Sequence, residues 1–229
     1  MKKAIFIVCL FVLGATTQAQ IISSSSKKVT TTKNTTPSNI SWYFKAGLNS
    51  MKFTGDEESD DWKRKLGYKF DLGFKKPISS MDMLTVYWGM DFSLGSRGYK
   101  YEYSYYNNYR NYGDYEVWRL CHNVQWAPIN IGANINLLEN LILDAHIGAY
   151  ISGDYLVTDK TKYETYYSNG DEKDSYWFDG PHAGDVGINF GLGIWYDKFN
   201  IEFGWQKGFV DYGGDIHTNN LLFKIGFML

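Results

Sequence analysis

The residues of this chain that could carry chemistry are charged side chains at alternate positions of otherwise apolar stretches. They are Lys45, Lys69, Lys75, Lys224, Asp71, Asp91, Asp144, Asp185 and Glu202. A strand points alternate side chains to opposite faces, so these charges are expected to share one face. Inside a narrow closed sheet they should pair as a ladder that fills the interior, because unpaired ions there are costly to desolvate. The alternative is a selective pore lined by the same charges.

The histidines offer weaker evidence for catalysis or metal binding. Of the four, His146 alternates with Asp144, and the sequence places no two of the others side by side. Neither a metal-binding pair of histidines on a helix nor a GxSxG nucleophile turn is present. We therefore expect no enzymatic activity, no cofactor and no metal site. A membrane enzyme at the barrel rim, built from His182, Asp185, Asp211 and His217, is the catalytic alternative.

Tyrosines crowd the segment from Tyr99 to Tyr115. Tyrosine provides a large, rigid contact area with a polar tip, which suits recognition of proteins and sugars. We predict that Tyr106, Tyr109 and Tyr112 contact an extracellular protein or glycan. The alternate tyrosines of 99–105 are expected to continue two strands as a solvated hairpin. Further acidic clusters at 56–61 and 171–179 do not have calcium-loop spacing, and the charge balance gives nucleic-acid binding no support.

The elements that would position these residues are strands of period two. Leu66, Phe70 and Phe74 alternate with small or charged residues, and similar alternation recurs along the chain. Eight strands are expected, at 41–53, 63–76, 83–97, 115–137, 140–152, 184–196, 199–210 and 217–229. Short turns at 77–82, 138–139 and 197–198 alternate with long loops at 54–62, 98–114, 153–183 and 211–216. This pattern predicts an all-β fold, an eight-stranded antiparallel transmembrane β-barrel built as an up-and-down meander.

Two details refine the expected strands. In the fourth, the apolar parity reverses between Trp126 and Ile129, which predicts a β-bulge at Ala127-Pro128. Aromatic residues near strand ends suggest interfacial girdles. These residues are Trp42, Phe44, Phe74, Trp118, Tyr196 and Phe199.

The N-terminal region has the layout of an export signal. Two lysines precede a short apolar run and small residues, as in a secretory signal peptide. We expect a signal peptide at 1–20, a flexible Ser/Thr/Lys leader at 21–40 and the barrel domain at 41–229. Cleavage would leave Cys121 as a lone thiol without an intramolecular partner. The chain is therefore expected in the outer membrane of a Gram-negative bacterium.

Short segments such as Lys45-Ala46-Gly47-Leu48-Asn49 and Val124-Gln125-Trp126-Ala127-Pro128-Ile129-Asn130-Ile131 carry a family resemblance. So do the segments at 185–193 and 220–227. Together they resemble the outer-membrane β-barrel domain called porin-family or PorT-like, over nearly all of residues 41–229. The resemblance implies a small closed barrel and no particular reaction.

We expect a structural or partner-binding role in contact with outer-membrane lipid, for a monomeric or weakly associating protein without nucleic-acid partners. The alternatives are a narrow porin-type channel for small solutes, a PorT-like barrel associated with secretion, and the rim-located enzyme.

Overall fold

The computed structural model describes residues 40–55, 62–106, 112–165, 168–177, 184–212 and 215–229. The expected signal peptide, the leader up to residue 39 and the acidic segment 56–61 lie outside these ranges. No helix in the described part of the chain is long and apolar enough to cross a membrane.

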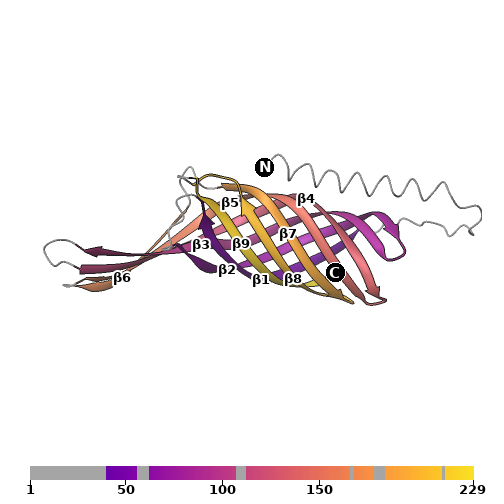
Figure 1. Cartoon of the computed structure of the whole chain (residues 1–229), viewed down its shortest axis with the longest axis horizontal. Helices are drawn as coiled ribbons and strands as arrows, with labels where there is room; N and C mark the ends of the chain where they lie inside the picture. The colour runs from indigo at the N-terminus through magenta and orange to yellow at the C-terminus, as the bar shows by residue number, and fades with distance from the viewer. Residues whose placement is uncertain (1–39, 56–61, 107–111, 166–167, 178–183, 213–214) are drawn as a thin grey trace, which may run out of the picture. The chain divides into compact units, whose positions relative to one another are not determined.

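The described residues form nine antiparallel strands (Figure 1). They are β1 (Ser41–Thr54), β2 (Trp62–Met81), β3 (Leu84–Tyr106), β4 (Tyr112–Leu138), β5 (Leu141–Thr165), β6 (Asn169–Trp177), β7 (Gly184–Tyr196), β8 (Phe199–Gly208) and β9 (His217–Met228). Eight of them pair in the order β4-β3-β2-β1-β9-β8-β7-β5, and pairing of β4 with β5 closes the ring. The predicted eight-stranded antiparallel barrel is thus confirmed.

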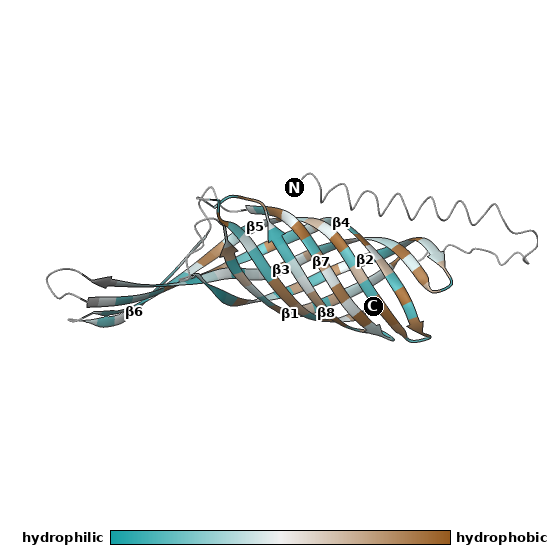
Figure 2. Cartoon of the chain, viewed as in Figure 1, coloured by the Kyte–Doolittle hydropathy of each residue, from teal (hydrophilic) through white to brown (hydrophobic). Residues whose placement is uncertain are grey.

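Alternation along each strand divides the barrel into two surfaces. Figure 2 shows apolar and polar residues alternating along the barrel strands. The outward positions are apolar: in β7, for example, Val186, Phe190 and Ile194 are all exposed. The inward positions carry the buried lysines, carboxylates and amides. The hydropathy is therefore inverted relative to a soluble protein, as expected for a sheet whose outside faces lipid.

One end of the barrel, which we call the turn end, has tight connections. Met81 pairs with Leu84, Leu138 with Leu141 and Tyr196 with Phe199, so each of these turns has two central residues. Asp197, the first central residue of its turn, adopts a φ of 53°, and Lys198 has no positive φ, which is the pattern of a type II′ hairpin turn. The prediction that Pro77 begins a turn is wrong. β2 continues to Met81, with a register shift between Pro77 and Ser79 that accommodates the missing N–H.

The predicted bulge in β4 is confirmed by both of its neighbours. On the β3 side, Gly89 pairs with Asn130 and Asp91 with Ala127, and on the β5 side the register shifts between Trp126 and Ile129. The extra residue returns the apolar side chains to the outside on both sides of the shift.

The opposite end of the barrel differs most from the expectation. Segments 98–114 and 153–183 were expected to be loops, but β3, β4 and β5 continue through much of them and a ninth strand, β6, pairs with β5. We call the resulting four-stranded sheet the raised sheet, formed by residues 98–106, 112–121, 157–165 and 169–177. Its inner face continues the lumen face of the barrel, and its outer face continues the lipid face.

The aromatic residues at strand ends occupy different levels. At the turn end the Trp42 and Phe74 rings lie 5.3 Å apart, as do the rings of Phe199 and Phe227. Trp118 does not join this girdle, because it pairs with Lys100 and Lys160 within the raised sheet.

Glycines leave room for the larger side chains of the interior. A Cβ added at Gly191 would collide with the imidazole of His146, and one at Gly132 would collide with the phenol of Tyr87. These glycines are required by the narrowness of the lumen.

Candidate functional site

The interior of the barrel is the first candidate site, because buried charges from many strands meet there. The residues of the expected ladder are all either buried or in contact with a buried partner. Glu202 of β8 accepts a hydrogen bond from Lys45 of β1 and forms an ion pair with Lys224 of β9, whose Nζ lies 2.7 Å from its Oε1. Lys224 also reaches Asp71 of β2 at 2.8 Å. These contacts tie four strands together across the lumen.

A second group centres on Asp144 of β5, which is fully buried. It pairs with Lys75 of β2, and it accepts hydrogen bonds from Tyr87 Oη at 2.6 Å and from Trp195 Nε1 at 3.1 Å. Each donor comes from a different strand. The carboxylate is thereby both neutralised and saturated with donors, which offsets its desolvation.

Two ladder residues have neutral partners instead of ions. Lys69 donates to the amide oxygen of Gln125 at 2.8 Å. Asp91 accepts a hydrogen bond from Tyr43 and another from Asn130 at 2.7 Å. The expected ladder of ion pairs is therefore interrupted at these two residues, whose hydrogen-bond partners are amide and phenol groups.

Asp185 and Arg97 close the lumen towards the raised sheet. Arg97 Nη1 lies 3.1 Å from Asp185, and its Nη2 lies 2.9 Å from Asp154. Thr218 and Tyr150 also donate to Asp185, at 2.6 and 3.1 Å. Arg97 was not among the residues expected in the lumen.

Four buried aromatic residues that complete the packing of the interior were not expected there either: Tyr43, Tyr87, Tyr150 and Trp195. Their signal was present in the sequence, because each shares the parity of the inward charges: Tyr87 is four residues from Asp91, and Tyr43 is two from Lys45. An aromatic residue on the polar face of a strand marks a position where the lumen must be filled.

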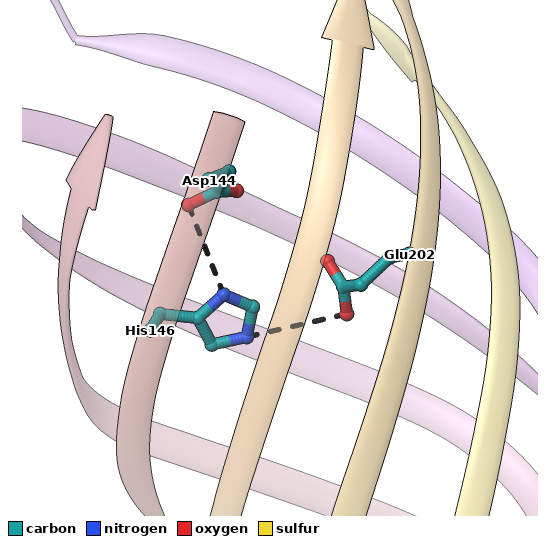
Figure 3. Close-up of side chains that lie close together, drawn as sticks. All are labelled: Asp144, His146 and Glu202. Atoms are coloured by element: carbon teal, nitrogen blue, oxygen red, sulfur yellow. Dashed lines mark ion pairs between the residues drawn. The ribbon is translucent and has the colours of Figure 1, made fainter. Parts of the chain in front are cut away.

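The side chains of Asp144, His146 and Glu202 form the one triad within the described ranges whose ligand atoms lie close enough to share a metal ion (Figure 3). His146 Nδ1 lies 3.9 Å from Asp144, and its Nε2 lies 4.0 Å from Glu202. The two nitrogens point to different carboxylates, so one ion cannot use both contacts. Lysines already neutralise both carboxylates, and these contacts favour packing over metal binding.

Of the residues of the rim-enzyme alternative that the structure describes, Asp185 and His217 each have other contacts. His182 lies outside the described residues. Asp185 is held by Arg97 and Thr218, whereas His217 contacts the Val210 carbonyl at 3.0 Å and Asp215 at 3.2 Å. An enzyme at the rim that works through a nucleophile would need that nucleophile, a base and an orienting acid within hydrogen-bond reach.

One cavity of the lumen is small. It has a volume of about 20 Å³ and is lined by Arg97, Lys69, Gln125 and Asp185 among others. This volume is about that of one water molecule. Eight strands leave an interior that side chains can fill, and here they nearly do.

The second candidate site is the far end of the raised sheet. Tyr103, Tyr115 and Tyr163 stand in one row across three strands, with the Tyr103 and Tyr115 rings stacked at 4.9 Å and inclined by only 4°. A groove of about 930 Å³ runs over this end and is lined by residues of four strands. The lining residues are Glu102, Tyr103, Ser104, Asp114, Tyr115, Glu116, Lys162, Tyr163, Glu164, Asn169, Gly170 and Asp171.

The expected contact residues are only partly described. Tyr106 ends β3 opposite Tyr112, the first residue of β4, but neither side chain is described, and Tyr109 lies outside the described residues. The interpretation of 99–105 as a strand extension is confirmed.

Cross-strand ion pairs organise the outer face of the raised sheet. Lys100 bonds Glu102 at 2.8 Å and Glu116 at 3.0 Å. Hydrogen bonds from Lys100 and Lys63 lower the pKa of Glu102 to about 2, and the carboxylates of Glu102 and Glu116 raise the pKa of Lys100. On the inner face, a bidentate pair joins Arg119 to Asp159 at 2.7 and 2.8 Å.

Comparison with known proteins gives likeness of fold alone. No protein-family model and no curated protein matches the chain. Among solved structures, Ail, the attachment invasion locus protein of Yersinia pestis, in complex with the heparin analogue sucrose octasulfate, is 14% identical over 83% of this chain and 99% of its own, with a TM-score of 0.38. Neisserial surface protein A is 9% identical over 83% and 99%, with a TM-score of 0.33. The outer membrane protease OmpT from Escherichia coli is 9% identical over 90% and 100%, with a TM-score of 0.36. The PorT-like resemblance stays a prediction.

Proposed function

We propose that this chain is an integral outer-membrane barrel without enzymatic activity, whose filled interior is structural and whose raised sheet binds a partner outside the cell. The apolar outer surface supports the membrane location, because side chains such as Phe203 and Ile225 are more than half exposed and would otherwise face water. The turn end would face the periplasm, as short turns do in outer-membrane barrels.

The observation that carries the binding role is the raised sheet itself. β6 lies outside the closed ring, so barrel closure does not require it. A groove nevertheless runs across its four strands. The sheet carries stacked tyrosines on its inner face and ion pairs on its outer face. Tyr103 and Tyr115 stack on each other through their ring faces, a contact that stabilises the sheet. Their ring edges and hydroxyl groups remain for contact with a protein or a glycan.

The ion pairs of the interior argue against the channel alternative. The charged side chains pair with one another across the lumen and so hold the strands together. The cavity beside them has room for about one water molecule. A solute would have to break several of these pairs to pass.

Site-specific photo-crosslinking in intact cells tests the binding role and captures the partner covalently, whatever its identity. A benzophenone side chain placed at Tyr103 or Glu164 should give a discrete adduct, because both positions line the groove. The matched control is the same group at Phe203, which is exposed on the lipid face. Absence of an adduct at the groove, or the same adducts at Phe203, would refute the proposal.

A further inference from the structure

The outer face of the barrel ends in a chain of aromatic side chains where the raised sheet begins. Tyr68 and His122 are joined by a hydrogen bond of 2.9 Å, the ring of Tyr155 lies 6.3 Å from His122, and Trp177 lies 6.4 Å from Tyr155. We call these four residues the aromatic row. Apolar residues such as Val124 and Ile151 lie on the barrel side of it. Aromatic residues of this kind mark the membrane interface, so the aromatic row indicates where the hydrocarbon ends.

Beyond the aromatic row, lysines line up across the same face. Lys63 pairs in register with Lys100, Lys100 with Trp118, Trp118 with Lys160, and Lys160 with Lys173. Directly opposed residues of antiparallel strands share a face, so these five side chains form one row, the lysine row. Lys65 adds to it, with its ammonium 3.9 Å above the Trp118 ring.

The lysine row lies at the right height for lipid headgroups. His122 and Trp118 are four residues apart on β4, which is about 13 Å along a strand. With a strand tilt of about 45° this is about 9 Å in depth. The headgroup zone is about 5–8 Å thick on each side of the hydrocarbon, and a lysine side chain can reach back by several ångströms. The ammonium groups therefore come level with the phosphates.

The charge balance of this face is also favourable. The next row outward, here called the acidic row, contains Glu102, Glu116 and Asp171, together with Lys162. Its carboxylates pair with the lysine row from the side away from the membrane, as Lys160 does with Asp171 at 2.9 Å. Exposed pairs of this kind are weak, and five lysines counting Lys65 outnumber three carboxylates. The surface nearest the membrane therefore keeps a positive charge.

We propose that the lysine row binds the phosphate groups of anionic lipids in the leaflet around the raised sheet. The aromatic row would anchor the depth of the barrel, and the lysines would select headgroups by charge. The groove lies farther from the membrane, and the acidic row lies between the lysine row and the groove, where its residues are part of the groove lining.

The test uses the full mature chain reconstituted in bilayers of phosphatidylcholine and phosphatidylglycerol at three to one. Electron paramagnetic resonance of spin-labelled lipids gives the association constant of phosphatidylglycerol relative to phosphatidylcholine. The variant Lys63→Gln, Lys160→Gln, Lys173→Gln should lower this ratio at least severalfold, because each lysine near an anionic surface contributes appreciably. The preference of the native protein should also weaken as salt rises.

The matched control is Lys162→Gln, an exposed lysine on the same face and strand as Lys160 but two residues farther out. It should leave the lipid ratio unchanged. Heat-dependent mobility in SDS gels verifies that each variant is folded. The proposal is refuted if the native protein has no preference for phosphatidylglycerol, if the triple variant keeps it, or if Lys162→Gln lowers it equally.

Discussion

At the scale of single residues, stability depends on charges that satisfy one another inside the barrel. Glu202 is the clearest case, because it neutralises both Lys45 and Lys224 and is almost completely buried. Alternation alone indicated that these residues face inward. It could not indicate which strands face each other across the lumen, and so could not assign Arg97 to Asp185 or Lys69 to Gln125.

Glu202→Gln should destabilise the barrel by about 3–5 kcal/mol, because two buried lysines lose their shared counter-charge. Urea unfolding in lipid vesicles, followed by tryptophan fluorescence, measures the loss. Lys162→Gln on the exposed outer face serves as the control and should change stability by less than about 0.5 kcal/mol. Equal effects in the two variants would contradict a structural role for the buried pairs.

The pKa of Glu102 gives a second prediction at this scale. Its value of about 2 in the folded protein lies below the usual 4.5 because Lys100 and Lys63 bond the carboxylate. A carboxyl group whose pKa is lowered by folding stabilises the folded protein at any pH above its usual pKa. This stabilisation is lost as the pH falls towards the lowered pKa of about 2. The ion pairs of the outer face should therefore survive at pH 4. Carbon-13 NMR of the Glu102 carboxyl should show a midpoint well below 4; a midpoint near 4.5 would contradict the pairing.

At the scale of elements, the strands of the barrel and the strand extension at 99–105 were predictable, and the parts of the raised sheet at 157–165 and 169–177 were not. Apolar residues at every second position fix a lipid face, so the eight strands and the bulge at Ala127-Pro128 follow from the sequence. The segments around Thr161 and Asp171 alternate polar with polar or aromatic residues, which resembles a solvated loop. The strands that these segments form are stabilised by side-chain pairs between neighbouring strands. Which residues pair depends on the strand register, and the alternation of residues along one strand does not predict that register.

The bulge gives a prediction about the number of residues in β4. Deleting Pro128 removes the extra residue and should turn one half of β4 over, placing Ile129 and Ile131 in the lumen. The deletion should abolish the heat-modifiable band in SDS gels. Pro128→Ala keeps the count and should preserve that band. A folded deletion variant would show that the strand can shift without the bulge.

At the scale of the whole molecule, an apolar belt surrounds a polar interior. Phe203 lies in the middle of the outward positions of β8, whereas Phe227 pairs with Phe199 at the turn end. The substitution Phe203→Arg should cost about 2–4 kcal/mol in a bilayer, and Phe227→Arg about 0–1 kcal/mol. Reversible unfolding in vesicles measures both. Similar costs at the two positions would place the membrane at a different level.

The filled lumen predicts electrical behaviour as well. Purified protein in a planar bilayer should show no steady channel conductance, because several interlocked ion pairs cross the interior. Glu202→Gln should not by itself open a path, since Asp144, Lys75 and Arg97 remain in place. Steps of stable conductance from the native protein would favour the porin-type alternative.

Because β6 is not part of the ring, residues 154–183, which include the outer part of β5, can be regarded as an interchangeable cassette. Gly153 of β5 already pairs with Gly184 of β7 at the barrel rim, so a two-residue turn placed there would keep every ring contact between these two strands. Descendants of this sequence could therefore lengthen, shorten or replace the intervening segment while inheriting an intact scaffold. Under selection from outside the cell, variation should accumulate in this cassette and leave the lumen charges almost unchanged.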